Sequence, residues 1–394
     1  MQHFYFDHNA TTPVAPPVLD EMRTCLAEVY GNASSIHYFG QAAKERLELA
    51  RRRVAALLGA PSKDIVKEIV FVSGGTEADN LAIRGTVLAS RGTAKHIITS
   101  AIEHPAVLNT CAQLQREGVA VDYLRVGASG VIDPDDLRRA LRPETVLVTI
   151  MHANNELGTL QPIREIAAIA REAGVRMHSD GVQAAGRIPI NVDDLGVDLY
   201  SISAHKFYGP KGAGSLYVRK GTVLAPILFG GHHERDRRAG TENVPVLSAM
   251  GVAAATLPQV DLAPLRDRLE QAVLDRVPDA RINCAGSPRV PNTSNLCFDY
   301  IEGEPLVISL DLRGFAISSG SACSSGAVEP SHVLRAIGLT DAQARSSIRI
   351  SLGASNTIEQ VDALADAIVE SVAHLRRISP EGRTVHPILE GTHA

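Results

Sequence analysis

Along most of the first 260 residues, segments with the apolar pattern of a strand alternate with segments with the apolar pattern of a helix. Short β-branched runs, typical of buried strands, are separated by stretches whose apolar positions repeat at helical spacing. The predicted strands are 68–72, 96–100, 121–126, 145–151, 175–180 and 197–204. Near-continuous apolar strands separated by helices indicate an α/β protein whose sheet is mostly parallel and covered on both faces.

After Val244 the pattern changes to two helical runs, followed by a second set of strands. The predicted elements are helices 245–257, 263–276, 304–312, 331–337 and 358–375, with strands 295–300 and 346–353. This part is typical of a smaller α+β domain. We predict a large domain of residues 13–257 and a small domain formed by residues 1–12 and 258–394.

Composition and charge narrow the class of protein. The 394 residues are 45% hydrophobic and 21% charged, with a formal net charge of -5. This mildly acidic balance gives no electrostatic reason to expect nucleic acid or an anionic membrane as a partner. Charged residues interrupt every apolar run before it reaches the length of a membrane span, and the N-terminus lacks the pattern of a signal peptide. We therefore expect a cytoplasmic protein.

Polar residues follow the carboxyl ends of four predicted strands, which is where open α/β sheets bind their ligands. They are His104, His152, Asn154, Asn155, Glu156, Asp180, Gln183, His205 and Lys206. Helix capping can explain any one of them. It explains poorly why His, Asn, Asp, Gln and Lys should gather at one edge of a sheet.

A glycine turn at residues 73–76 joins a predicted strand to a helix. There, backbone N–H groups and the helix dipole can receive an anion such as a phosphate, with Gly74, Gly75 and Thr76 as the cradle. The turn is neither a Walker A motif nor G-x-G-x-x-G, which disfavours a nucleotide. A helix capped by Thr76 without any ligand is, on the local sequence, at least as good an interpretation.

Lys206 ends a buried strand and precedes a Gly-Pro turn, an unusual place for a lysine. A partly desolvated lysine can form a Schiff base with the aldehyde of pyridoxal phosphate, whereas a solvated lysine could simply begin a surface loop. The neighbouring polar residues favour the first interpretation. Candidates are Thr76, Ser203 and His205 for the phosphate, Asp180 for the pyridinium nitrogen, Gln183 for the ring oxygen, and His104 for the ring face.

The five cysteines show no Cys-x-x-Cys spacing, so neither a disulfide framework nor a thiolate zinc site is predicted. Cys25, Cys111 and Cys297 lie in helix-like or strand-like patterns and are predicted to be buried structural thiols. Cys323 lies in a Ser/Gly-rich stretch that predicts a mobile loop at about 317–330. A thiol on such a loop suits a nucleophile that enters a site and leaves again; the alternative is an incidental surface cysteine.

Two further features concern possible ligands. Arg349 is flanked by Ile348 and Ile350, which favours a buried guanidinium that binds a substrate carboxylate over a surface arginine. His232 and His233 are adjacent and lack the i,i+3 or i,i+4 spacing of a helical metal site. We expect no metal site of the protein's own, and a solvated or interface loop at 229–244.

Together the motifs resemble the cysteine desulfurases of the NifS/IscS type, which belong to the class V pyridoxal-phosphate-dependent aminotransferases. The resemblance runs from about Phe4 to about Ala373. It rests on FDHNATTP, GNASSIHYFGQ, SGGTEADN, SAIEHPAVL, ANNELGTLQPI, SDGVQA, SAHKFYGPKG, RAGTENV and SSGSACSSGAVEPSHVLRAIG. The chain departs from the usual pattern at His8, at Gly181, where Ala is usual, and at His232-His233.

The resemblance implies a fold-type I enzyme with a seven-stranded sheet in its large domain. It implies Lys206 as the Schiff-base lysine, Cys323 as the residue that receives sulfur as a persulfide, and His104 as a catalytic residue that shuttles protons. The implied cofactor-binding residues are Gly75, Thr76, His104, Asn155, Asp180, Gln183, Ser203, His205, Lys206 and Thr241, with Asn155 and Arg349 holding the substrate.

The same resemblance implies partners. The substrate would be L-cysteine, and the sulfur acceptor an iron–sulfur scaffold protein of the NifU/IscU type, with which Cys323 would share a cluster. Thr241 resembles a residue that reaches the phosphate of a neighbouring subunit, which implies a homodimer. A selenocysteine lyase or an aminotransferase on the same scaffold, or a non-catalytic assembly scaffold, stays open as an alternative.

Overall fold

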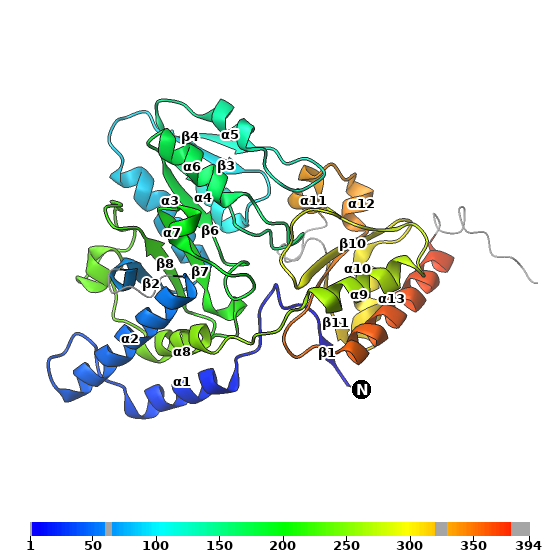
Figure 1. Cartoon of the computed structure of the whole chain (residues 1–394), viewed down its shortest axis with the longest axis horizontal. Helices are drawn as coiled ribbons and strands as arrows, with labels where there is room; N and C mark the ends of the chain where they lie inside the picture. The colour runs from blue at the N-terminus through cyan, green and yellow to red at the C-terminus, as the bar shows by residue number, and fades with distance from the viewer. Residues whose placement is uncertain (1, 60–64, 320–328, 380–394) are drawn as a thin grey trace, which may run out of the picture.

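The computed structural model describes residues 2–59, 65–319 and 329–379. Cys323 and most of its predicted loop therefore lie outside the described residues. Figure 1 shows two α/β bodies side by side, with the N-terminal segment running from the smaller body into the larger one. The predicted division into residues 13–257 and 258–394 stays a prediction.

The larger sheet has seven strands among the described residues. They are β2 (Ile69–Val72), β3 (His96–Ser100), β4 (Ala120–Leu124), β5 (Thr145–Thr149), β6 (Arg176–Asp180), β7 (Leu199–Ser203) and β8 (Gly214–Val218). Their order is β2-β8-β7-β6-β5-β3-β4, and β8 alone runs antiparallel to its neighbours. The predicted mostly parallel sheet is confirmed. The apolar pattern does not predict β8, whose five residues directly follow a glycine-rich turn.

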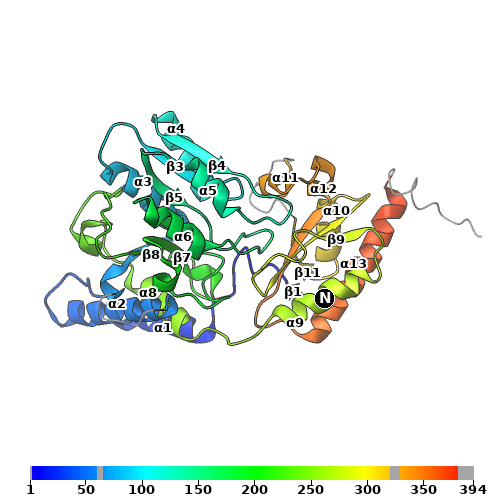
Figure 2. The ribbon, with the colours of Figure 1, turned by 45° about the horizontal axis from the view of Figure 1, so that its top comes forward.

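Both faces of this sheet are buried. Along β2, Ile69 and Phe71 belong to one hydrophobic cluster, whereas Val70 and Val72 belong to another on the opposite face. This is the period of two that strand geometry imposes. The helices around the sheet are α1 (Pro16–Glu28), α2 (Tyr38–Leu57), α3 (Gly75–Ala89), α4 (Pro105–Arg116), α5 (Pro134–Ala140), α6 (Ile163–Glu172), α7 (Val192–Leu195) and α8 (Val244–Ala255), all labelled in Figure 1 and, apart from α7, also in Figure 2. Among the described residues, no helix combines the length and the apolar character that crossing a membrane requires.

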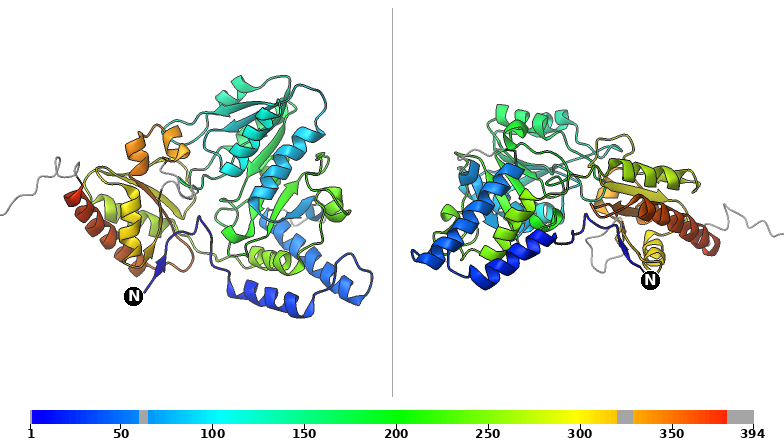
Figure 3. Two further views of the ribbon diagram at one scale, coloured as in Figure 1. Left: turned by 180° about the vertical axis from the view of Figure 1, so that it is seen from behind. Right: turned by 60° about the horizontal axis from the view of Figure 1, so that its bottom comes forward.

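The smaller body is built on an antiparallel sheet in the order β12-β13-β10-β9. Its strands are β9 (Ala280–Ile282), β10 (Thr293–Phe298), β12 (Ser318–Ser319) and β13 (Ser347–Ser351), and its helices are α9 (Ala263–Leu274), α10 (Gly303–Asp311) and α13 (Ile358–Ile378). The N-terminal β1 (Phe4–Tyr5) pairs with β11 (Phe315–Ala316), and Figure 3 shows the N-terminus beside these elements from two sides. This is the predicted smaller α+β unit.

Two short helices of the C-terminal part, α11 (His332–Ala336) and α12 (Asp341–Arg345), lie between the two bodies. Val333 and Leu334 of α11 are buried in the main cluster of the larger sheet. The chain on the C-terminal side of the predicted Cys323 loop is therefore packed against the larger body.

The four cysteines for which the structure gives an environment are buried. This confirms the prediction for Cys25, Cys111 and Cys297, and Cys284 joins them. Burial, the largest effect, raises the pKa of each thiol above its usual value. These four side chains are therefore inert packing groups at neutral pH.

The segment predicted as a loop at 229–244 has a buried anchor. The carboxylate of Glu234, in the short 3₁₀ helix η3 (His233–Asp236), accepts two hydrogen bonds from Arg51 of α2, both 2.8 Å long. It also accepts one from the Phe71 N–H at 3.0 Å. Both partners of this ion pair are buried, so neither charge has water to stabilise it if the other is removed.

We predict that Glu234→Ala lowers the free energy of unfolding by about 3–5 kcal/mol, because it removes the buried carboxylate that both Nη atoms of Arg51 contact and leaves only the partly exposed Glu48, 3.5 Å from Nε. Chemical denaturation of the purified protein measures the loss. Asp362→Ala, which removes an exposed ion pair with Arg268, is the matched control and should cost far less stability than Glu234→Ala. Equal losses in the two variants would contradict the anchoring role.

Candidate active site

A cavity of about 250 Å³ opens at the carboxyl ends of the parallel strands. It is lined by Gly75, Thr76, Asp79, His104, Met151, Asn155, Asp180, Val182, Gln183, Ser203, His205 and Lys206. Nine of the ten residues predicted to bind the cofactor are in this set. The exception is Thr241, an exposed residue that precedes α8.

One end of the cavity is the N-terminus of α3. Gly74 caps this helix, and Gly75 begins it. A Cβ atom at Gly75 would lie 2.8 Å from Cγ2 of Val182, which follows the end of β6. Glycine therefore lets the start of α3 approach Val182 this closely. The N–H groups of the first turn, the Thr76 hydroxyl and Ser203 at the end of β7 form a set of donors suited to a phosphate.

His205 lies beside this end and is neutral at physiological pH. Its Nδ1 lies 3.2 Å from the Thr11 hydroxyl. Burial, followed by the nearby charges of Lys206, Lys211 and Arg187, lowers the pKa of His205 to about 4. A neutral imidazole here can donate one hydrogen bond to an anion without adding a net charge.

Asp180 is the last residue of β6 and is buried. Its Oδ1 accepts a hydrogen bond of 2.9 Å from the Val182 N–H. Burial raises the pKa of Asp180 to about 6, and the Val182 N–H and the charge of Lys206 oppose that rise. The side chain can therefore carry a negative charge at pH 7 in a site with little water, which suits a protonated ring nitrogen.

Lys206 ends the 3₁₀ turn η2 (Ala204–Lys206) that follows β7. Its Nζ donates to the backbone oxygens of Asn9 at 2.6 Å and of Ala10 at 2.8 Å. The Gln183 amide donates to the same Asn9 oxygen at 3.0 Å. The N-terminal segment thus holds the lysine amine at the wall of the cavity, which excludes the alternative of a fully solvated lysine.

His104 caps α4, and its Nδ1 accepts a hydrogen bond of 3.1 Å from the Ala106 N–H. In the neutral ring the proton therefore lies on Nε2. Burial, followed by the charges of Lys206 and His332, lowers the pKa of His104 to about 4. The ring is neutral at pH 7 and lies on the cavity wall.

Arg349, predicted to bind the substrate, does not line the cavity directly but lies behind Asn155. It is buried in β13, where Nη1 donates to the Asn155 backbone oxygen at 3.0 Å and Nη2 to Asp7 Oδ1 at 2.8 Å. Its buried Nε has no hydrogen-bond partner among the described residues.

The sequence did not point to Asp79, Met151 or Val182 as parts of this site. Asp79 follows Thr76 by three residues, one turn of α3, and this spacing was the signal that could have found it. An aspartate within an amphipathic helix ordinarily faces solvent, and the structure instead leaves Asp79 only 1% exposed. Glu103, beside His104, is likewise fully buried.

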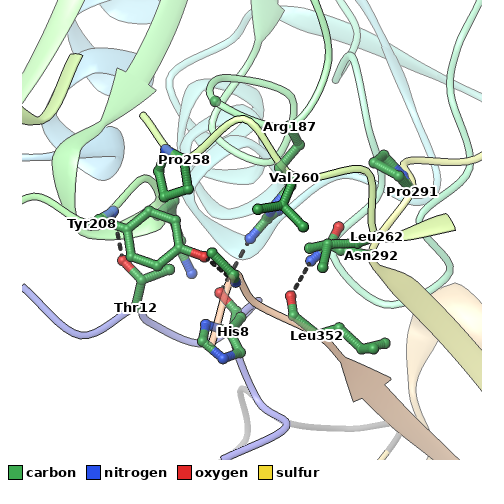
Figure 4. Close-up of a pocket in the computed structure, with 13 residues that line it drawn as sticks. His8, Thr12, Arg187, Tyr208, Pro258, Val260, Leu262, Pro291, Asn292 and Leu352 are labelled. Atoms are coloured by element: carbon green, nitrogen blue, oxygen red, sulfur yellow. Dashed lines mark hydrogen bonds between the residues drawn. The ribbon is translucent and has the colours of Figure 1, made fainter. Parts of the chain in front are cut away.

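A second, small cavity of about 40 Å³ lies on the other side of Lys206, where the two bodies meet (Figure 4). Arg187 crosses it and donates to the His8 backbone oxygen at 3.1 Å, while the Ala354 N–H donates to the Tyr208 hydroxyl at 2.8 Å. The volume is enough for ordered water. His8, which departs from the family pattern, therefore borders this cavity and not the larger one.

The fold and the gathered side chains define the class of protein. Residues 4–364 match the model of the class-V aminotransferases, and the chain belongs to this family. It is 47% identical over 382 residues to the cysteine desulfurase IscS of Dictyoglomus turgidum, covering 95% of this chain and 96% of that protein. It is 48% identical over 386 residues to a cysteine desulfurase of Nostoc sp., covering 96% and 95% of the two chains.

Solved structures support the same family assignment. A NifS-like protein superimposes with a TM-score of 0.87 at 37% identity, covering 95% of this chain and 100% of the other. A structure described as SspA in complex with cysteine superimposes with a TM-score of 0.81 at 39% identity, covering 88% and 98%. The predicted NifS/IscS-type resemblance is confirmed.

The family uses pyridoxal phosphate, and the residues of the cavity fit this group. The glycine at the start of α3 leaves the space that a Cβ would fill, and Asp180 supplies a buried carboxylate. Lys206 supplies an amine at the wall of the same cavity. A phosphate, a protonated ring nitrogen and an aldehyde would each find a matching group among these residues.

We predict that the free energy of unfolding depends less on pH in Glu103→Gln than in the wild type. Burial raises the pKa of Glu103 to about 8, so between about pH 5 and 8 the folded state binds a proton that the unfolded state has released. The free energy of unfolding should therefore fall as pH rises through this range, by up to about 1.4 kcal/mol per unit.

Urea denaturation at several pH values compares the wild type with Glu103→Gln, and the exposed Glu165→Gln serves as the control. The difference in stability between wild type and Glu103→Gln should change with pH, whereas the control should run parallel to the wild type. Parallel curves for all three proteins would show that Glu103 is not protonated in the folded state.

A further prediction concerns Gly181, where the family usually has alanine. A Cβ at Gly181 would overlap the ring of Tyr200, whose hydroxyl lies 2.7 Å from Nδ1 of His152. Gly181→Ala should therefore destabilise this protein by about 1–3 kcal/mol through overpacking, as measured by thermal unfolding. Gly127→Ala, where a Cβ meets no atom within 4 Å, is the control. An unchanged melting temperature for Gly181→Ala would contradict the overlap.

Proposed function

We propose that this protein is a cysteine desulfurase that converts L-cysteine to L-alanine and passes the sulfur to Cys323 as a persulfide for iron–sulfur cluster assembly. The observation that carries the proposal is the joint placement of the Lys206 amine, the Asp180 carboxylate and the α3 cradle in one cavity. Its support is the near full-length similarity to proteins named cysteine desulfurase and to a structure described as a complex with cysteine.

Several residues of the cavity have roles that follow from their environments. Thr76, Ser203 and His205 bind the phosphate, Gln183 binds the ring oxygen, and Lys206 forms the covalent link to the cofactor. Asp180 keeps a proton on the ring nitrogen. When bound, pyridoxal phosphate acts as an electron sink for the amino acid attached to it.

The substrate is held and deprotonated by groups on opposite sides of the cavity. Arg349 and Asn155 bind the carboxylate of L-cysteine, which fixes the rotation of the substrate about its Cα. Lys206 and His104 exchange protons with it, and His104 can take part because burial keeps its ring neutral, so that a proton can be accepted and then returned. Burial of Asn155 and Arg349 limits the access of water to the substrate carboxylate.

Cys323 supplies the step that distinguishes a desulfurase. Its thiolate forms an S–S bond with the sulfur of L-cysteine, the substrate C–S bond breaks, and the carbon takes up a proton to give L-alanine. Atoms and electrons balance without an external oxidant. Cys323 lies outside the described residues, so this role rests on the sequence.

The described residues on either side of that segment lie near the substrate groups. Ser318 in β12 pairs with Arg349 in β13. Ser331 donates a hydrogen bond of 2.5 Å to Glu156, the neighbour of Asn155. Both ends of the segment that carries Cys323 therefore begin beside the proposed carboxylate-binding residues, which supports the assignment.

The proposal includes a homodimer. Six aromatic or aliphatic side chains of the described chain are 68–94% exposed, and a subunit interface that covers some of them would remove part of this solvation cost. They are Tyr30, Ile36, Tyr38, Val223, Phe229 and Leu312. Thr241 lies in the segment anchored by Glu234 and is exposed, as a residue that reaches a neighbouring subunit's phosphate must be. The sulfur acceptor is a scaffold protein of the NifU/IscU type, and a cytoplasmic location stays a prediction.

The test is to load the purified protein with pyridoxal phosphate, add L-cysteine, and measure alanine, sulfide and a persulfide on Cys323 by mass spectrometry. Cys323→Ser should lower sulfide release by on the order of 10²-fold or more while the absorption of the bound cofactor persists. Ser324→Ala, in the same segment with the thiol intact, is the control. Full activity of Cys323→Ser would contradict the proposed nucleophile.

The same assay separates the alternatives. A keto acid in place of alanine indicates an aminotransferase, and turnover of selenocysteine without a persulfide on Cys323 indicates a selenocysteine lyase. A protein that takes up no pyridoxal phosphate at all is a non-catalytic scaffold.

A further inference from the structure

Asp79 is a second buried aspartate in the proposed cofactor cavity. It lies on α3, one turn after Thr76, and lines the cavity together with Asp180. Its Oδ1 has no hydrogen-bond partner within the part of the chain that the structure describes. A buried carboxyl oxygen without a partner is costly, and it needs an explanation from the site that it faces.

The group beside Asp79 does not neutralise it. His178 Nε2 lies 3.7 Å from Asp79 Oδ1, but this ring already makes contacts with the Ser201 hydroxyl at 2.9 Å and the Thr149 hydroxyl at 2.8 Å. Burial lowers the pKa of His178 to about 3, so the ring is uncharged. Asp79 therefore gains no counter-charge from it.

The charged group that acts most on Asp79 is another acid, Asp180. Burial, the largest effect, raises the pKa of Asp79 well above its usual value, and the charge of Asp180 adds to that rise, whereas a hydrogen bond with the Ser201 hydroxyl opposes it. Asp180, in contrast, has the Val182 N–H and the charge of Lys206 to stabilise its ionised form. Two neighbouring carboxyl groups with little access to water do not both ionise, so the negative charge settles on Asp180 and the proton on Asp79.

The backbone brings the two side chains to the same place. Asp180 is paired in register with Ser201 across β6 and β7, and His178 precedes Asp180 by two residues and so faces the same side of the sheet. The α3 helix packs on this side, where Asp79 approaches His178. Thr149, His178, Ser201, Asp79 and Asp180 thus form one buried polar group beneath the cavity.

We propose that Asp79 is a positioning residue that remains a neutral carboxylic acid and directs its O–H at the carboxylate of Asp180. It fixes the orientation of that carboxylate toward the ring nitrogen of the cofactor and limits the site to a single negative charge. The proposal rests on the placement of pyridoxal phosphate under the proposed function, and it adds a residue to which that function assigns no role.

The test compares two substitutions in the full-length protein. Asp79→Asn keeps the size, the neutrality and a donor, whereas Asp79→Leu keeps only the approximate size. The affinity of the apoprotein for pyridoxal phosphate is measured by fluorescence titration, and the absorption spectrum of the bound cofactor is recorded. Asp79→Asn should bind within about 3-fold of the wild type with the same spectrum, and Asp79→Leu about 10-fold more weakly with a shifted spectrum.

A double-mutant cycle separates positioning from a merely structural role. Because Asp180→Asn removes the carboxylate that Asp79 orients, adding Asp79→Leu to that background should weaken cofactor binding by less than about 2-fold. Thermal melts of the apoproteins verify folding. If the leucine variant does not fold, Asp79→Ala takes its place in the cycle.

Each outcome decides the question. Loss of affinity in Asp79→Asn equal to that in Asp79→Leu would mean that a charged Asp79 is needed, and it would overturn the proposal. If Asp79→Leu weakened cofactor binding equally in the wild type and in Asp180→Asn, the proposal would also be overturned, because Asp79 would then act through packing alone. Failure of the wild type to bind pyridoxal phosphate would instead overturn the proposed function, which the wild-type assay reveals separately.

Discussion

The arrangement of the site depends on hydrogen bonds to one N-terminal segment, residues 7–12, that runs between the two bodies (Figure 1). The backbone oxygen of Asn9 accepts from Gln183 and Lys206 of the larger body. The Asn9 side chain donates to the Asn155 oxygen at 3.1 Å and to the Thr293 hydroxyl of the smaller body at 2.9 Å. Gln183, Lys206 and Asn155 come from separate elements, so their contacts with this segment fix their positions relative to one another.

Burial then decides the charge of each group. His104, His178 and His205 have pKa values far below their usual range, and Glu103 and Asp79 have pKa values far above it. In a medium of low polarity the uncharged form is preferred unless a partner stabilises the ion. The charges that remain are Lys206, Asp180 and the Arg349–Asp7 pair, each held by named donors or acceptors. A cofactor with an anionic phosphate and a cationic ring thus meets a site with few, fixed charges.

The sequence predicted the parts of this architecture that local patterns specify. Apolar runs located six strands of the larger sheet, and the polar residues after them proved to share one cavity, since parallel strands bring their carboxyl ends to the same edge. What it could not predict depends on pairing between distant segments. β8 is defined by its two neighbours, Glu234 is buried only because Arg51 lies opposite, and Asp79 is buried only because α3 packs on β6.

The hydrogen bonds made by Lys206 have a consequence for how such a site tolerates changes in sequence. Its amine is bound by the main-chain oxygens of residues 9 and 10, and these atoms are present whatever side chains the positions carry. The Ala10 side chain is exposed, so mutations can accumulate there without loosening the lysine. The geometry is instead vulnerable to insertions and deletions, which move the oxygens themselves. The contact with the Ala10 oxygen is therefore encoded in the length of the segment and leaves no signature in the identity of residue 10.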